Sequence, residues 1–253
     1  RTIASDVIRR KDFRSALLSP WIWLNSKQAI HPHDSANTFD WLMDQSEQNG
    51  LTSAFYFICG RTDAKKDAQY DLEMPQIRKL MKKIAARGHE IGLHPSYNTY
   101  NKPDEILREA NRLWRVCSEE GITQPAWGGR MHFLRWDQSV TVQAWNDAGM
   151  TYDSTLGYAD KPGFRCGTCH EYPAFDPVNN RQLNVRIRPL VAMDCTVMAK
   201  RYLGLGETEQ AYEKFRQLKE GCRAVGGNFT LLWHNSYFWK AEQFHIYERL
   251  LKD

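Results

Sequence analysis

Several short apolar runs in this chain end in residues that could do chemistry. These residues are His94, Arg130 with His132, Asp153 and His234. Functional side chains of α/β folds lie at the carboxyl ends of strands, so we expect these residues to converge. His94, His132 and a carboxylate would suit Zn²⁺, which takes imidazole and carboxylate ligands and activates water. Any one of them could equally make a purely structural hydrogen bond, but their joint occurrence at strand ends favours a site.

The element that positions His94 has the clearest pattern in the sequence. Apolar residues at helical spacing predict a helix over 74–87 that ends at Gly88. A short apolar strand follows and stops at His94, because Pro95 cannot donate to a sheet ladder. His89 lies five residues before His94, so the two face opposite sides of the strand. We therefore expect His89 to pack against helices.

Helices and strands alternate along most of the chain. Arg130 and His132 are two residues apart and share a face if their strand continues that far. The helix–glycine–strand units predict parallel strands with right-handed crossovers, roughly six or seven of them, in a barrel-like or open α/β domain. We interpret residues 1–253 as one domain, with an irregular and helical segment over 1–37 and a loop-rich region over 155–207. The expected helices cover about 39–49, 74–87, 103–120, 137–149, 208–225 and the C-terminus, and the expected strands 52–59, 89–94, 126–134, 151–153, 170–175, 184–197 and 228–234.

Composition excludes several classes of function. The net charge of +4 is modest, and Lys and Arg stand near Asp or Glu, which predicts solvated helix faces and no nucleic-acid partner. No apolar run is long enough for a membrane span, and residues 1–4 do not open a signal peptide. Of the six cysteines, Cys117 and Cys222 fall on apolar helical stripes. This pattern favours buried free thiols and a cytoplasmic location.

The motif residues, taken together, resemble those of the polysaccharide deacetylases (carbohydrate esterase family four), and within them an uncharacterised bacterial branch. The similarity covers most of the chain from about Thr38 onward. The stretch from Gly88 to His94 resembles the family's second motif, Gly-His-Glu-Ile-Gly-x-His. Ser53–Phe57 resembles a strand of the family, and Gly129–Arg130 resembles its arginine motif. Tyr152–Thr155 resembles the aspartate-containing fourth motif, and Leu231–His234 resembles the final Leu-x-His motif.

The resemblance implies a distorted (β/α) barrel with a divalent metal, usually zinc, and a hydrolase that removes acetyl groups from a carbohydrate. His94 would be a metal ligand, and His234 would protonate the leaving amine or alkoxide. The partner would be an acetylated glycan or sugar. Aromatic rings stack on sugar faces, so we expect Tyr97 and Trp233 to bind substrate, although most of the tryptophans fit the core. The residues that the resemblance assigns to catalysis are Arg130, Asp153 and His234.

Two departures from the family's pattern favour a second hypothesis. The first aspartate motif is not found: Thr38-Phe39-Asp40 is followed by Trp41 and opens a helix, so the chain could lack the family's first strand. The family's second metal histidine is replaced by Asn98, whose amide oxygen is a poor zinc ligand, and His132 could compensate. The alternative function is a non-catalytic carbohydrate-binding or assembly protein on the same fold.

The stretch Cys166-Gly167-Thr168-Cys169-His170 formally matches a haem attachment motif. We do not expect haem, because the pattern of elements is α/β and no axial methionine is obvious. A CxxC redox or zinc role is a third hypothesis, but a zinc knuckle would need further ligands. Related deacetylase-like chains carry a similar loop, so we expect a structural position at the rim of the fold.

Overall fold

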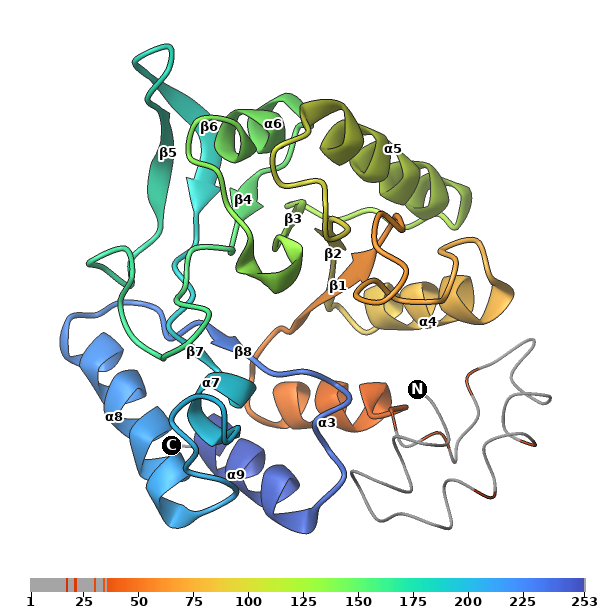
Figure 1. Ribbon diagram of the computed structural model, residues 1–253. Coiled ribbons are helices and arrows are strands. Elements are labelled where there is room, and N and C mark those ends of the chain that lie inside the picture. The colour runs from red at the N-terminus through yellow and green to blue at the C-terminus, as the bar shows by residue number, and fades with distance from the viewer. Residues whose placement is uncertain (1–16, 18–20, 22–29, 31–33, 35, 253) are drawn as a thin grey trace.

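The computed structural model describes residues 17, 21, 30, 34 and 36–252, so the prediction for 1–37 lies almost wholly outside the described residues. Its main element is a six-stranded sheet in the order β1-β2-β3-β4-β6-β5 (Figure 1). The first five strands in that order are parallel, and β5 is antiparallel to β6. The strands are β1 (Ala54–Ile58), β2 (Glu90–His94), β3 (Gly128–Gly129), β4 (Tyr152–Asp153), β5 (Tyr172–Asp176) and β6 (Arg181–Ile187).

A second, smaller sheet lies beside the first. It consists of β7 (Ala192–Met193) and β8 (Leu231–Leu232), which run parallel to each other. Within the described residues the two sheets share no ladder of hydrogen bonds. The prediction of an α/β fold is therefore confirmed, while the described strands do not close into a barrel.

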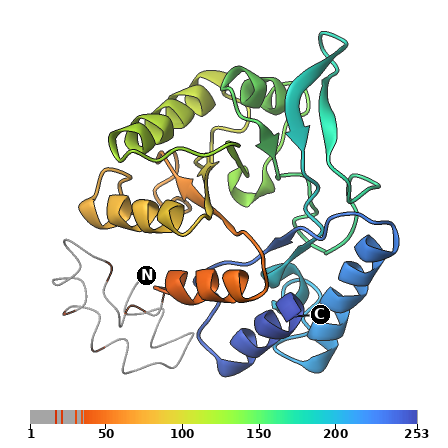
Figure 2. The same ribbon diagram turned by 180° about the vertical axis from the view of Figure 1, so that it is seen from behind.

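The helices surround the two sheets (Figures 1 and 2). Three of them, α4, α5 and α6, pack on the larger sheet, and α8 and α9 pack on the smaller one. Their bounds are α3 (Phe39–Gln48), α4 (Pro75–Ala86), α5 (Pro103–Glu119), η1 (His132–Leu134, a 3₁₀ turn), α6 (Thr141–Asp147), α7 (Asp194–Met198), α8 (Glu209–Ala224) and α9 (Ala241–Lys252).

The helix before His94 forms as its pattern predicts. Its stripe of Ile and Leu side chains is buried against β2, and Gly88 ends it with φ of +79°, a conformation that favours glycine. His89 is also where it was expected, packed between elements: its Nδ1 accepts a hydrogen bond from the Ser53 backbone N–H at 3.1 Å. On its other side, His89 Nε2 lies 3.3 Å from a carboxylate oxygen of Glu47 on α3.

Three strands are shorter than the sequence pattern suggested. In the run 126–134 only the two residues of β3 are in a strand, and in the run 228–234 only the two residues of β8 are. The run 184–197 is not one strand, because it divides into β6, β7 and α7. The chain turns into α7 where the Asp194 carboxylate accepts the Cys195 backbone N–H and the Thr196 hydroxyl donates to the Met193 carbonyl. Similarly, a turn held by Asp137 delays the start of α6 to Thr141.

The six cysteines are all free thiols, and Cys117 and Cys222 are buried as predicted. The CxxC pair lies on the loop before β5 and its two thiols have different surroundings. Cys166 Sγ lies 3.6 Å from the Leu156 carbonyl, whereas Cys169 packs in a buried cluster with Val191 and Cys222. None of the helices in the described part of the chain is both long and apolar enough to cross a bilayer.

The contact between β2 and β3 depends on a residue without a side chain. A Cβ atom on Gly129 would lie inside the contact distance of the Leu93 backbone, and Leu93 is its partner in the ladder. Since backbone atoms cannot rotate away as a side chain can, only glycine lets these two strands pair. The adjacent Gly128 likewise leaves room for the Tyr152 ring.

Gly129→Ala should therefore destabilise the protein by about 1–3 kcal/mol, as expected for overpacking. Urea unfolding with an unchanged m-value would measure the loss. Gly221→Ala is the matched control: Gly221 is inside α8, where the new methyl group would meet only the Phe164 ring at 3.6 Å. Replacing a mid-helix glycine should be neutral or raise stability by about 0.5–1 kcal/mol. Equal effects of the two changes would contradict this account of the β2–β3 contact.

Candidate functional site

His94 is the last residue of β2, and its ring is fixed by the neighbouring strand. Its Nδ1 lies 2.6 Å from the carbonyl oxygen of Arg130, directly after β3. A carbonyl can only accept, so Nδ1 carries the proton and Nε2 keeps its lone pair. Burial, followed by the nearby His132, lowers the pKa of His94 to about 3. The ring is therefore neutral at physiological pH and can serve as a metal ligand.

His132 reaches the same place by a different route. The strand ends at Gly129, so Arg130 and His132 do not share a strand face as one continued strand would require. Instead η1 carries His132 to His94, with 4.8 Å between the two ring centroids. Its Nδ1 lies 3.0 Å from Oδ1 of Asp67. Burial lowers the pKa of His132 even though Asp67 opposes that effect, so this ring too is neutral with Nε2 free.

Asp67 was not identified from the sequence. Its side chain is fully buried, and its carboxylate accepts the backbone N–H groups of Thr62, Asp63 and Tyr97, each at 2.8 Å. Burial disfavours its charge, but these donors and His132 lower its pKa overall. Asp67 thus holds the loops after β1 and β2 together and orients His132. The only sequence signal was its place in a polar loop after a predicted strand.

His234 forms the second ion pair of the site. It lies two residues beyond β8, and its Nδ1 is 2.8 Å from Oδ1 of Asp194, while its backbone N–H donates to Oδ2 at 2.7 Å. Asp194 is fully buried, whereas the His234 side chain is 48% exposed. The charge of Asp194 raises the pKa of His234. Asp194 was missed because the sequence pattern placed it inside a predicted strand.

His94 and His132 lie side by side, and His234 contributes to their electrostatic environment. A positive charge on His234 lowers the pKa of both His94 and His132. Their environments separate them into two kinds. His94 and His132 are held neutral, and His234 favours its protonated form. Such a separation distinguishes metal or base positions from a proton donor.

Arg130 and Asp153 are both buried. The Arg130 guanidinium donates to the Ser154 carbonyl at 2.8 Å and to the Ser154 hydroxyl at 2.9 Å. Asp153 accepts the backbone N–H of Thr155 at 2.8 Å and its hydroxyl at 2.6 Å. Burial raises the pKa of Asp153 to about 7. Their hydrogen bonds brace the loops after β3 and β4, and the carbonyl oxygen of Arg130 accepts from His94.

The remaining expected site residues have distinct places. Asn98 donates to the Thr62 carbonyl at 3.0 Å, and its own amide oxygen accepts from Arg135 at 3.1 Å. Tyr97 lies beside the site, with its ring centroid 6.4 Å from that of His132. Trp233 stacks on Phe238 at 5.6 Å, within an aromatic cluster formed by α3, α8, α9 and the loop after β8.

An exposed aromatic residue that the sequence analysis did not identify adjoins His132. Phe133 is 54% exposed and has φ of +59°, a left-handed conformation that is rare for a bulky residue. Its ring centroid lies 4.7 Å from that of His132 and 5.2 Å from that of Tyr97. Strained residues of this kind cluster at functional sites. Phe133 and Tyr97 together form an aromatic surface next to the histidine pair.

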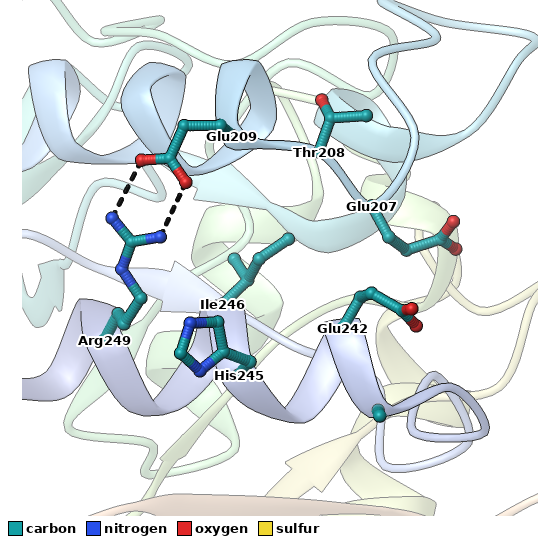
Figure 3. A pocket seen from close by; sticks show the side chains of 8 residues that line it. Glu207, Thr208, Glu209, Glu242, His245, Ile246 and Arg249 are labelled. Atoms are coloured by element: carbon teal, nitrogen blue, oxygen red, sulfur yellow. Dashed lines mark hydrogen bonds and ion pairs between the residues drawn. The ribbon is translucent and has the colours of Figure 1, made fainter.

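A separate pocket lies between the starts of α8 and α9 (Figure 3). Its charged wall includes a bidentate pair in which Arg249 donates to Glu209 at 2.6 and 2.8 Å. His245 also lines it, on the exposed face of α9. None of the strand-end residues belongs to this pocket, so His245 is a suitable control in experiments on the site.

Comparisons with known proteins show a likeness of fold. No family model matches the chain, and no curated protein matches it. Among solved structures, a probable polysaccharide deacetylase from Pseudomonas aeruginosa PAO1 has a similar fold, with a TM-score of 0.52 and 15% sequence identity. The match covers 86% of this chain and 67% of that one. The resemblance to polysaccharide deacetylases is thus supported at the level of the fold.

The two ion pairs predict separate titrations. Asp194→Asn should lower the pKa of His234 and, because it weakens the positive charge that acts on His132, slightly raise that of His132, whereas Asp67→Asn should lower the pKa of His132 and not that of His234. Because Asp194 raises the pKa of His234 in the folded state, their pair stabilises the fold fully below about pH 6.5, the ordinary histidine pKa, and loses this effect as pH rises through the raised value. NMR titration of the histidine rings in metal-free protein measures these values. An unchanged His234 titration in Asp194→Asn would contradict the assignment.

Proposed function

We propose that the protein is a metal-dependent hydrolase that removes acetyl groups from a carbohydrate. The observation that carries this proposal is the pairing of His94 with His132, both with lowered pKa values, together with His234, whose pKa is raised by Asp194 and whose charge acts on the other two. Ester or amide hydrolysis needs an activated water and a proton for the leaving group. The likeness of the fold to a probable polysaccharide deacetylase supports the choice of acetylated sugars as substrates.

His94 and His132 would supply two of the protein ligands that a catalytic Zn²⁺ takes. His94 and His132 each have Nδ1 bonded to an oxygen acceptor, which is the arrangement that orients zinc-binding imidazoles. The two Nε2 atoms would hold the metal, and Asn98 remains in the loop scaffold. When bound, the metal supplies a Lewis acid that activates water and polarises a carbonyl. Among the described residues, no third His, Cys or carboxylate group joins this pair.

The chain's own residues would do the remaining work. His234 carries a proton that it can give to the leaving amine or alkoxide, and the buried Asp194 holds the ring in place and keeps it charged. The exposed ring of Phe133 would stack against a sugar ring beside the histidine pair, with Tyr97 packed against it edge to face. Arg130 would act as a positioning residue, since its carbonyl oxygen orients His94.

The alternative is a carbohydrate-binding protein without catalysis. The specific observation in its favour is the absence of a third protein ligand beside His94 and His132 in the described residues. Asp40, the nearest match to the family's first aspartate motif, pairs with Lys83 and Arg87 at the surface of α3 and α4. Glycan binding that survives both EDTA and His234→Ala, without acetate release, would favour this alternative.

Removing the proton donor should abolish turnover. His234→Gln should lower kcat for acetate release from acetylated chito-oligosaccharides or acetylated xylan by about 10²–10⁴-fold, with a smaller change in KM. The matched control is His245→Gln, which changes a histidine outside the site and should leave both constants unchanged. An enzyme-coupled acetate assay on the zinc-loaded protein measures these effects. Equal rates in the wild type and His234→Gln would overturn the assignment of His234.

Metal dependence provides a second test. Dialysis against EDTA should abolish acetate release, and added Zn²⁺ should restore it. Asp67→Asn should shift this reactivation to about 10–100-fold higher zinc concentration, because Asp67 orients His132. Full activity after removal of the metal, verified by elemental analysis, would exclude a metal-dependent mechanism.

A further inference from the structure

Three side chains with different donor atoms meet just beyond the carboxyl ends of β7 and β8, the two parallel strands of the smaller sheet. Asp194 offers a carboxylate oxygen, Cys195 a thiol sulfur and His234 a ring nitrogen, and these atoms all lie within 4.8 Å of one another. They come from two segments that are 40 residues apart, the β7–α7 junction and the loop after β8. Among the described residues, no other group of three or more His, Cys, Asp or Glu side chains has its ligand atoms this close together.

Cys195 has no part in the proposed hydrolysis. Its side chain is half-buried, between the apolar cluster of Leu134, Leu190 and Met193 and the Asp194–His234 pair. Burial, followed by the charge of Asp194, raises the pKa of the Cys195 thiol to about 12, so Cys195 is not set up as a nucleophile. A thiol next to a carboxylate and an imidazole instead has the composition of a site for a borderline or soft metal.

We propose that Asp194, Cys195 and His234 form a second metal site, which takes Zn²⁺, Co²⁺ or Cd²⁺ and withdraws His234 from proton transfer. On binding, the thiol proton of Cys195 and one proton of the His234 imidazolium leave to solvent, and sulfur–metal and nitrogen–metal bonds form with no change in oxidation state. The carboxylate and the thiolate together balance the charge of the ion, which favours binding at a partly buried position. The exposed side of His234 gives the ion access.

The second site differs in chemistry from the first. His94 and His132 offer only nitrogen, whereas the second site contains sulfur, so the two can be told apart by spectroscopy. The evidence for the second metal site is the geometry of Asp194, Cys195 and His234. Its effect on turnover rests on the proposed function: a metal at His94 and His132 would support acetate release, and excess metal on His234 would suppress it.

Titration of the metal-free full chain with Co²⁺ tests the site without any assay of activity. We expect a near-ultraviolet charge-transfer band from thiolate-bound Co²⁺, which should be lost in Cys195→Ser and retained in His94→Ala. The matched control is Cys166→Ser, which removes another partly exposed thiol and should retain the band. A wild-type titration without this band, or a band that persists in Cys195→Ser, would overturn the proposal.

Two further measurements keep the proposal falsifiable if Cys195→Ser does not fold. In the unaltered chain, Cd²⁺ should slow alkylation of Cys195 by iodoacetamide at least tenfold, with Cys166 in the same digest as the internal reference. Equal rates at Cys195 with and without Cd²⁺ would contradict the site. If the protein releases acetate, its rate should pass through a maximum as Zn²⁺ rises, and the falling limb should disappear in Cys195→Ser. A protein that shows the cobalt band but releases no acetate would refute the proposed function and leave the second site standing.

Discussion

The hydrogen bond from His94 to the carbonyl oxygen of Arg130 is the interaction on which the site depends. It selects one tautomer of His94 and leaves Nε2 with its lone pair, in a ring that lies 4.8 Å from that of His132. The acceptor is itself fixed, because the Arg130 backbone N–H donates to the Leu93 carbonyl at 3.0 Å. The orientation of the candidate ligand is thus an extension of the β2–β3 ladder. That ladder in turn requires glycine at position 129.

The site contains two Asp–His pairs with similar distances and opposite consequences. Asp67 lies 3.0 Å from His132, and Asp194 lies 2.8 Å from His234. The two pairs differ in which effect on the histidine pKa is the larger. Burial outweighs the carboxylate at His132 and lowers its pKa, whereas the charge of Asp194 outweighs burial at His234 and raises it. The same chemical pair is therefore found with a lowered histidine pKa in one place and a raised one in the other.

The sequence was sufficient for the parts of the fold that local pattern determines. Helices such as α4 have regular apolar stripes, so their extent could be predicted. His94 is followed by a proline, so its position at the end of a strand could be predicted as well. Asp67 and Asp194 could not be found in this way, because their roles depend on contacts across 65 and 40 residues. The β7–α7 junction was also hidden. The apolar run over 184–197 has the composition of a strand, and only the hydrogen bonds of the Asp194 and Thr196 side chains turn it into a helix.

The two halves of the site belong to different sheets, so the site exists only if these sheets are held in register. Packing provides one connection: Leu134, at the end of the turn that carries His132, lies against Leu190 and Met193 beside β7, with Leu232 of β8 at the edge of the cluster. Hydrogen bonds provide another, because the loop after His234 is tied to the segment before α3. Asn235 donates to the Ala36 carbonyl at 2.9 Å, and the Thr38 hydroxyl donates back to the Asn235 carbonyl at 3.0 Å.

The stretch Thr38-Phe39-Asp40 resembles an aspartate motif in sequence, but its contacts give it a structural role. Thr38 fixes the loop that follows the proton donor, and Asp40 faces Lys83 and Arg87 at the surface. The adjacent Trp41 packs against Phe238, Phe244 and Tyr247, so the start of α3 anchors the loop after β8 and α9 together. The stretch that looks most like a missing catalytic motif therefore supports the site structurally.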